Sequence, residues 1–324
     1  MPMAVVCREL GPPEGLRLET FASLPLVVGQ VRVAVRAAGI NFPDILMTAG
    51  EYQLKPPLPF TPGVEAAGDV VEVNDAEGVT VGDRVIVKMR HGAYCDEAVA
   101  TPAQLVKLPS NFDYAEGATF LAGHGTAYHG LIDRGRLQSG EVLLVHGAGG
   151  GVGLAAVEMG KMLGATVIAT ASSDEKLEIA KARGADHLVR YDQEPFRDAV
   201  KRITDGRGAD VVFDPVGGEV FENSMRCIAW GARLLIIGFT GGIGLAKTNL
   251  LMIKGASVLG VRAGEAVRKN PALGEVRIKA LLEWAEAGKI RPNVSHRLPL
   301  EDYARAMRLL IDRKAIGRVA LTMG

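Results

Sequence analysis

Residues 143–157 read LLVHGAGGGVGLAAV, and this stretch decides the fold of the chain. A run of apolar residues leads into a glycine-rich turn, and small apolar residues at helical spacing follow the turn. Glycine lets a backbone approach a pyrophosphate closely, and the free N–H groups at the start of a helix face the anion. The stretch therefore predicts a strand, a nucleotide-binding loop and a helix.

The spacing within the loop supports the same interpretation. It fits the dinucleotide fingerprint in the register Ala148-x-Gly150-x-x-Gly153, with alanine at the first position. Gly153 would let the helix lie tightly on its strand, whereas the alternative is an ordinary tight turn. The residues expected to bind the cofactor here are Ala148, Gly149, Gly150, Gly151, Val152 and Gly153.

Strands and helices alternate on both sides of this loop. Apolar strands are predicted at Val142–His146, Thr166–Thr170, His187–Val189, Val211–Asp214, Arg233–Gly238 and Val258–Val261. The helices between them are predicted at Val152–Leu163, Asp174–Arg183, Phe196–Thr204 and Val220–Cys227. This alternation is typical of a doubly wound α/β fold with a parallel sheet.

The first third of the chain is β-rich instead. Short strands are predicted at Gln30–Ala37, Ala67–Val73, Asp83–Lys88, Gly92–Val99 and Gln104–Leu108, as in a compact barrel or irregular sheet. After residue 261 the rhythm breaks at Gly264–Pro271, before two further helices and a closing strand, Arg318–Met323. We interpret this tail as a return to the first domain. The predicted division is 1–122, 123–264 and 265–324.

Composition excludes several classes of protein. Lys plus Arg and Asp plus Glu each count 37, so the basic excess of a nucleic-acid binder is missing. No apolar run approaches the ~20 residues that span a bilayer. Residues 1–8 lack a signal-peptide pattern, and the three cysteines are scattered, as in a reducing compartment. We expect a cytoplasmic enzyme whose partners are small molecules, neither nucleic acid nor membrane.

The residues after the second strand of the α/β segment favour NADPH over NADH. An NAD site usually places Asp or Glu about twenty residues beyond the loop, but this chain has Ala171-Ser172-Ser173 and then Lys176. Hydroxyls and an ammonium can bind a 2′-phosphate, which a carboxylate would repel. Asp174 and Glu175 can point outward as charges of the helix N-terminus. The alternative is that Ser172 merely caps the helix and that Lys176 is solvated.

These motifs resemble the zeta-crystallin-like quinone oxidoreductases of the medium-chain dehydrogenase/reductase superfamily, over nearly the whole chain. The family signature runs from Gly140 to Lys161 and departs at Glu158, where glutamine is usual. The supporting segments are Ala38–Asp44, Thr61–Glu65, Gly125–Tyr128, Phe213–Gly218 and Ile237–Phe239.

The resemblance implies a GroES-like catalytic domain and a Rossmann domain, with the cofactor in the cleft between them. It also implies a homodimer, formed by edge-to-edge extension of the Rossmann sheet near Ser257–Val261. Carried over by position, Thr126 would lie near the nicotinamide ribose, and Lys176 and Tyr191 at the adenosine phosphate end. The resemblance places Gly217, Gly238 and Phe239 along the cofactor. It also implies a cofactor contact at Arg318.

No zinc is expected. Zinc alcohol dehydrogenases of this superfamily use a cysteine and a Gly-His-Glu segment, where this chain has Asn41 and Val64-Glu65. Only Cys95 lies near the place of the structural zinc lobe, and the six histidines show no ligand spacing, so we interpret them as surface or helix-start residues. Without a Lewis acid to polarise an alcohol or a simple ketone, alcohol dehydrogenation is not expected. Quinones and enones are already electrophilic and can accept a hydride without one.

Two residues are candidates for the chemistry. Tyr52 resembles the tyrosine near the nicotinamide in quinone oxidoreductases, and its phenol can donate to an enolate or semiquinone oxygen. A loop tyrosine packed on a domain edge is an equal alternative. Asn41 can donate an amide hydrogen bond to substrate or cofactor, or it is a turn residue before Pro43. Arg262 stands where related sequences often carry an aromatic residue. It either favours an acidic or CoA-linked substrate or is a solvated charge.

The resulting hypothesis is an NADPH-dependent oxidoreductase that transfers a hydride to a quinone. The nearest alternative is an enoyl or enone reductase that acts on α,β-unsaturated carbonyl compounds or thioesters. A third alternative, from another class, is a non-catalytic NADPH-binding protein.

Overall fold

A computed structural model describes residues 1–324 and divides into two compact units. The first unit is Met1–Ala122 with Pro292–Gly324, and the second is Gly123–Arg291. The chain thus returns to the first unit at Pro292, whereas the sequence placed the return at residue 265. Residues 265–291 belong to the second unit because buried Arg277 anchors them there: it donates to the Asp133 carboxylate at 3.2 Å and to the Ala263 carbonyl at 3.3 Å.

A six-stranded, all-parallel sheet forms the centre of the second unit. Its strands are β8 (Val142–Val145), β9 (Thr166–Ala171), β10 (His187–Arg190), β11 (Ala209–Asp214), β12 (Ile228–Ile236) and β13 (Ser257–Gly260). The order across the sheet is β10-β9-β8-β11-β12-β13. The chain leaves β8 in one direction and resumes at β11 in the other, so the topological switch point lies between these two strands. The predicted doubly wound sheet is confirmed.

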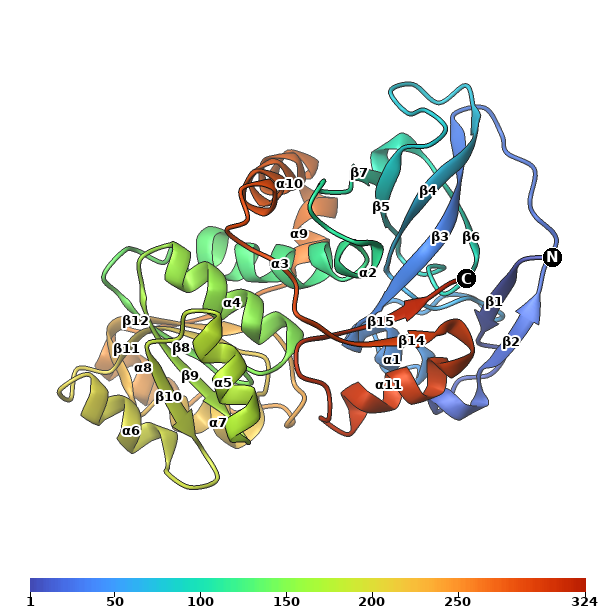
Figure 1. Cartoon of the computed structure of the whole chain (residues 1–324). Helices are drawn as coiled ribbons and strands as arrows, with labels where there is room; N and C mark the ends of the chain where they lie inside the picture. Colours follow the sequence, from blue (N-terminus) through green and yellow to red (C-terminus); the bar gives the residue numbers. More distant parts are fainter. The chain divides into compact units, whose positions relative to one another are not determined.

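Helices cover both faces of this sheet. The helices are α4 (Gly151–Met162), α5 (Asp174–Ala182), α6 (Phe196–Ile203), α7 (Gly218–Ser224) and α8 (Thr248–Lys254). Helices α4 and α5 lie together against β8, β9 and β10 (Figure 1). On the other face, Leu144 and Leu234 of the sheet pack with Phe196 of α6, Phe221 of α7 and Leu251 of α8. Both faces are dry, which explains why the strands are continuous apolar runs.

The segment before β8 and the segment after β13 complete the second unit. They comprise most of α3 (Phe120–Tyr128), the π-helical turn η3 (His129–Arg134), α9 (Ala263–Lys269) and α10 (Pro271–Glu286). The sequence predicted a break at Gly264–Pro271. Two helices occupy this region instead, separated only at Asn270, because proline at the first position of α10 leaves no hydrogen bond unmade.

The first unit is built on a seven-stranded sheet with the path β14-β15-β3-β4-β5-β7, and β6 pairs with β3. The strands of this unit are β1 (Met3–Val6), β2 (Arg17–Thr20), β3 (Gln30–Ile40), β4 (Glu65–Asn74), β5 (Arg84–Lys88), β6 (Glu97–Ala100), β7 (Leu105–Lys107), β14 (Val294–Pro299) and β15 (Arg318–Thr322). Its helices are α1 (Phe42–Thr48), α2 (Tyr114–Gly117) and α11 (Tyr303–Ile311), with short 3-10 turns at Pro13–Gly15, Pro102–Gln104 and Leu300–Asp302. The expected strand at Gly92–Val99 is wrong except at its end, because Ala93–Cys95 form a buried loop beside β1.

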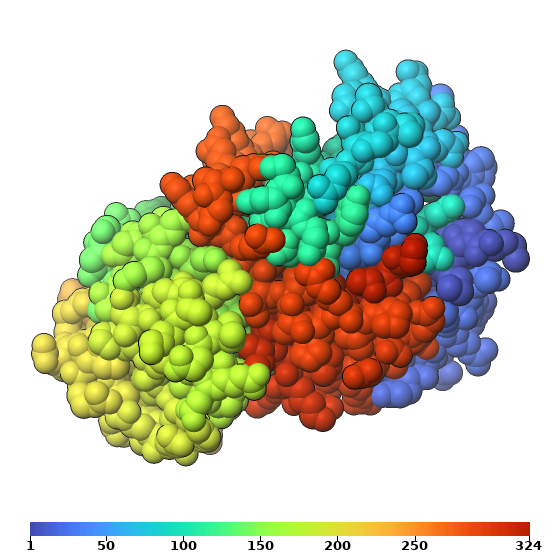
Figure 2. Space-filling model, viewed as in Figure 1, coloured from blue at the N-terminus to red at the C-terminus, as the bar shows by residue number.

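The two ends of the chain meet in this unit. Strand β15 pairs antiparallel with β3, and the C-terminal segment lies beside the N-terminal residues (Figure 2). The Tyr303 hydroxyl donates to the Leu16 carbonyl at 2.6 Å, and Arg308 forms a bidentate pair with Glu14. The sequence interpretation of a returning tail therefore has a physical basis in these contacts. No helix in either unit is both long and apolar enough to cross a membrane.

Candidate active site

The glycine loop lies at the carboxyl end of β8, beside the switch point of the sheet. The backbone at Gly147 has φ +56°, a conformation that favours glycine, and the Ala148 N–H donates to the Thr170 carbonyl of the neighbouring strand at 3.0 Å. Gly150 is extended, and α4 begins at Gly151. In open α/β sheets, ligands bind beyond the carboxyl ends of the strands at this point.

The start of α4 presents free donors. The backbone N–H groups of Gly151 and Val152 donate to no other group of the protein, because no helical carbonyl precedes them. The helix runs for 12 residues, so its partial positive charge at this end also favours an anion. These residues fit the pyrophosphate of a dinucleotide.

Two glycines of the loop are required by close contacts. A β-carbon on Gly153 would lie 2.3 Å from the Gly147 carbonyl oxygen, so the first turn of α4 packs against the loop itself. A β-carbon on Gly149 would lie 2.6 Å from the Lys176 β-carbon. The stem of Lys176 therefore crosses the loop, which places this predicted phosphate ligand next to the predicted pyrophosphate site.

The carboxyl end of β9 carries the predicted 2′-phosphate ligands. Ser173, and not Ser172 as the alternative interpretation had it, is the N-cap of α5, and its hydroxyl accepts from the Lys176 N–H at 3.4 Å. The Asp174 carboxylate is turned to Arg190, with 2.7 Å between Oδ2 and Nη1. Tyr191 follows β10, and its N–H donates to the Ala171 carbonyl at 3.3 Å. The residue is 45% exposed.

Arg190 is a residue that the sequence analysis missed. It bonds both Asp174 and Asp192, and thereby offsets the negative charge of these two carboxylates. The side-chain hydrogen bond to Asp192 is the main cause that raises the pKa of Arg190. The available signal was its place directly after the predicted strand His187–Val189 and directly before Tyr191.

The loops after β11 and β12 supply the other half of this edge. The Asp214 carboxylate, whose pKa burial raises, accepts from the N–H groups of Val216 at 2.8 Å and Gly217 at 3.0 Å. Gly217 has φ +75°, and a β-carbon there would lie 2.3 Å from the Gly242 carbonyl oxygen. Phe239 is 54% exposed and follows Gly238, which approaches the Pro215 carbonyl. Thr126 belongs to the same unit, on α3.

In the first unit, Asn41 and Arg318 form a direct contact. Val319 of β15 pairs with Ile40 of β3, so Arg318 and Asn41 are neighbours at the next position of the antiparallel ladder. The Arg318 Nη2 donates to the Asn41 Oδ1 at 2.7 Å. The Asn41 N–H donates to the Asp44 carboxylate at 2.8 Å, and the same oxygen accepts from the Tyr94 hydroxyl at 2.8 Å.

A second buried carboxylate faces the same cation. Glu65 accepts from the N–H groups of Leu121 at 2.6 Å and Ala122 at 2.9 Å, and so caps the first turn of α3. Burial raises the pKa of both Glu65 and Asp44 to about 7, and the Arg318 charge partly opposes each shift. The sequence analysis considered Glu65 only as the counterpart of a zinc-site glutamate and missed this cap.

Tyr52 stands apart from that cluster in its contacts. Its N–H donates to the Leu46 carbonyl at 3.1 Å, and its half-buried ring packs against the core that contains Ile45 and Met47. Its hydroxyl makes no hydrogen bond within the protein. A tyrosine whose ring is held and whose hydroxyl is unused can serve as a donor to a ligand.

The histidines depart from the sequence interpretation. His124, His129 and His146 are buried, not surface residues. His146 lies between the hydroxyls of Thr170 at 3.0 Å and Ser224 at 2.8 Å, and burial lowers its pKa to about 3. A His in such a place stays neutral and ties β8 to β9 and α7. No group of three or more His, Cys, Asp or Glu side chains is arranged to hold a metal ion.

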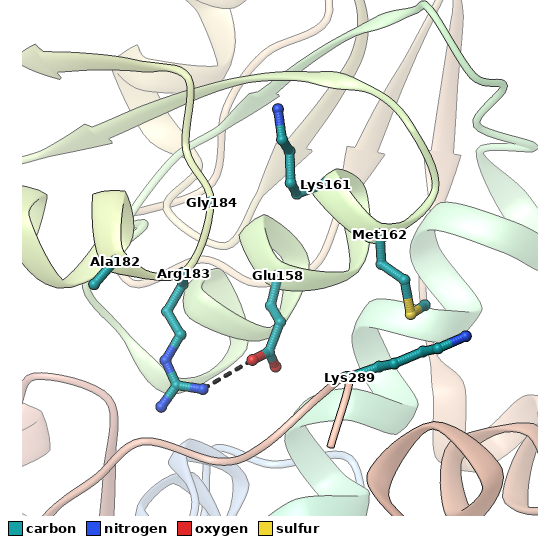
Figure 3. Close-up of a pocket in the computed structure, with 7 residues that line it drawn as sticks. All are labelled: Glu158, Lys161, Met162, Ala182, Arg183, Gly184 and Lys289. Carbon is teal, nitrogen blue, oxygen red and sulfur yellow. Dashed lines mark hydrogen bonds and ion pairs between the residues drawn. The ribbon is translucent and has the colours of Figure 1, made fainter. Parts of the chain in front are cut away.

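A hollow of about 540 Å³ lies at the other end of α4 from the glycine loop (Figure 3). There the Glu158 and Arg183 side chains point toward each other, with 2.8 Å between Oε1 and Nη1, and Glu158 also contacts His124 at 3.1 Å. Burial opposes ionisation of Glu158, but the hydrogen bond from His124 and the charge of Arg183 hold its pKa below the ordinary value. The glutamate at the usual glutamine position thus has a structural role. Arg262, the other departure, is exposed and 4.0 Å from Glu265.

Comparison with known proteins gives two domain families. Residues 28–127 match the alcohol dehydrogenase GroES-like domain, and residues 151–277 match the zinc-binding dehydrogenase family. The quinone oxidoreductase-like protein 2 homolog of Nematostella vectensis is 38% identical, over 98% of this chain and 88% of that protein. The quinone oxidoreductase of Homo sapiens is 30% identical, over 99% of this chain and 97% of that protein.

Solved structures agree with these relatives. A Pseudomonas syringae quinone oxidoreductase has a TM-score of 0.89 at 30% identity, over 99% of this chain and all of that one (100%). A mycobacterial protein solved with NADPH has a TM-score of 0.91 at 28% identity, with coverage of 99% and 100%. JamJ enoyl reductase has a TM-score of 0.87 at 28% identity, with coverage of 100% and 99%.

Proposed function

Since this chain belongs to the quinone oxidoreductase-like family of the medium-chain dehydrogenase/reductase superfamily, we propose that it reduces a quinone with NADPH and without zinc. The observation that carries the proposal is the edge of the second unit's sheet. This edge carries the free N–H groups at the start of α4 and the Lys176 stem over Gly149. It also carries the serine pair before α5, Ser172 and Ser173.

The charges at the end of β9 support NADPH over NADH. Lys176 supplies an ammonium group, and Arg190 neutralises Asp174, the carboxylate that would otherwise face a 2′-phosphate. Ser172 keeps its hydroxyl for a ligand, because Ser173 is the residue that caps α5. A 2′-phosphate would therefore meet cations and a hydroxyl.

The first unit supplies the groups that would act on the acceptor. NADPH, when bound, supplies the hydride. Tyr52 would donate a proton from its free hydroxyl to the acceptor oxygen, and Asn41 would orient acceptor or nicotinamide through its amide N–H. The zinc-free part of the proposal is supported by Asn41 and Val64, which stand where zinc alcohol dehydrogenases of the superfamily carry cysteine and histidine ligands.

A second candidate function is reduction of an enone or enoyl thioester. It is favoured by the similarity to JamJ enoyl reductase, because the same donor groups would serve an enolate. Both reactions need an electrophilic acceptor and a proton donor, and the range of acceptors that the protein reduces distinguishes them.

We also propose a homodimer formed through β13. This strand is the outer strand of the six-stranded sheet, so one row of its backbone groups is unpaired. Large apolar side chains are exposed nearby: Trp230 on β12 (77%) and Met252 and Ile253 on α8 (75% and 58%). Light scattering coupled to size exclusion should give twice 34.3 kDa, and Trp230→Glu should shift the mass toward the monomer.

The test of function is steady-state oxidation of NADPH and NADH with a panel of acceptors. The panel contains a benzoquinone, a naphthoquinone, an alkenal, a cyclic enone and a crotonyl thioester. Quinone turnover well above the others supports the proposal, whereas dominant enone or thioester turnover favours the second candidate. Tight NADPH binding without turnover of any acceptor would contradict both and favour a binding protein.

A further inference from the structure

Asn41 is held by the protein at three points. Its N–H donates to Asp44 at 2.8 Å, its Oδ1 accepts from Arg318 at 2.7 Å, and its Nδ2 donates to the Gly39 carbonyl at 3.2 Å. The residue is only 5% exposed. An amide group has two N–H bonds, so one of them remains without a partner in the protein.

The contact with Arg318 decides which way the amide faces. An asparagine side chain fits its site in two orientations, related by exchange of oxygen and nitrogen. A guanidinium group carries only hydrogen-bond donors. It can therefore bond to the amide oxygen of Asn41 but not to the NH₂ group. The Gly39 carbonyl imposes the same choice from the other side, since it accepts only from the nitrogen.

Arg318 is itself held for this contact. Asp44 and Glu65 interact electrostatically with its charge, and Tyr94 fixes Asp44 through a 2.8 Å hydrogen bond. Strand β15 sets its position by pairing with β3. Two carboxylates of its own unit therefore already interact with this charge, an arrangement suited to orienting a neighbour more than to neutralising a cofactor phosphate.

We propose that Arg318 is a positioning residue, which orients the Asn41 amide so that its remaining N–H is presented to the ligand. The proposal rests on the proposed function, because it supposes that Asn41 contacts acceptor or nicotinamide. It revises the role that the family resemblance implied for Arg318, a direct contact to the cofactor.

The first test follows the Asn41 amide itself and does not require turnover. The ¹H–¹⁵N signals of the Asn41 side chain, assigned by their loss in Asn41→Asp, should move or broaden in Arg318→Met. Arg318→Lys, which keeps a donor, should restore them in part. Arg297→Met is the control: it removes an arginine of the adjacent strand β14, paired with Asp113 at the surface, and should leave the signals unchanged. Unchanged Asn41 signals in folded Arg318→Met would overturn the proposal.

The second test is a double-mutant cycle of Arg318→Met and Asn41→Ala. If Arg318 acts through Asn41, each single variant lowers kcat/KM by about ten-fold or more, and the double variant loses no more than Asn41→Ala alone. NADPH affinity, measured by fluorescence titration, should show the same lack of additivity. Independent, multiplying losses would overturn the proposal and return Arg318 to a direct ligand. Failure of the acceptor panel would refute the function while the amide signals still decide the positioning role.

Discussion

Lys176 lies across Gly149: its β-carbon would be 2.6 Å from a β-carbon added to that glycine. The contact joins the phosphate loop to the first turn of α5, although Gly149 and Lys176 are 27 positions apart in the sequence. It brings a cation to the predicted cofactor site. The cation comes from the helix after the second strand of the sheet, where dinucleotide sites discriminate between cofactors.

Lys176→Met should weaken the preference for NADPH. The loss of an ammonium group beside a 2′-phosphate is expected to lower kcat/KM for NADPH by about ten-fold or more and to change that for NADH little. The measurement is the ratio of the two efficiencies with one acceptor. Lys181→Met, at the last turn of the same helix, is the matched control. An unchanged ratio in Lys176→Met would contradict the assignment.

Tyr52→Phe should lower turnover without harming the fold. A general acid contributes roughly 10²–10⁴-fold, so kcat should fall by about 10²-fold or more while NADPH affinity stays the same. Stability should hardly change, because the hydroxyl makes no hydrogen bond within the protein.

The control for Tyr52 is Tyr303→Phe. Its hydroxyl donates to the Leu16 carbonyl at 2.6 Å, so this variant should lose about 1 kcal/mol of stability and keep its turnover. Wild-type kcat in Tyr52→Phe with every acceptor would exclude the proton-donor role.

His146 should make the protein sensitive to acid. Its pKa is about 3 in the folded state, lowered by burial, whereas an unfolded His titrates near 6.5. The unfolded state therefore binds the extra proton between these values, and the stabilising contribution is complete above pH 6.5 and lost as pH falls. Relative to His146→Asn, the wild type should lose up to about 1.4 kcal/mol per pH unit below pH 6.5. Denaturant unfolding at a series of pH values measures this, and a constant difference would contradict it.

Asp44 should give a pH dependence of stability opposite in sign to that of His146. Burial raises its folded-state pKa to about 7 from 3.8, so the folded state binds the extra proton between these values. Stability from this group is present below pH 3.8 and is lost as pH rises toward 7. Relative to Asp44→Asn, the wild type should become less stable over that range, with a slope of at most about 1.4 kcal/mol per pH unit. A difference that grows in favour of the wild type as pH rises would refute the assignment.

Local patterns in the sequence were enough for the phosphate loop and the parallel sheet. Strand periodicity, glycine spacing and helix starts each depend on residues a few positions apart, and the residues 143–157 contain all three. Gly153 and Lys176 could be selected in this way, and the structure places both at the loop. The prediction of a break at Gly264–Pro271 was wrong for a local reason, because asparagine and proline also occur at the start of helices.

What the sequence by itself determined is the class of fold, the nucleotide loop and the family, because these are written in short-range spacing and motif. The tertiary structure alone decided where α9 and α10 belong, that His146 is buried and neutral, and that Arg190 turns Asp174 aside. It also decided that Arg318 meets Asn41, 277 positions away in the chain. The physical reason is that strand register and burial depend on which distant segments pack together, and no local pattern carries that information.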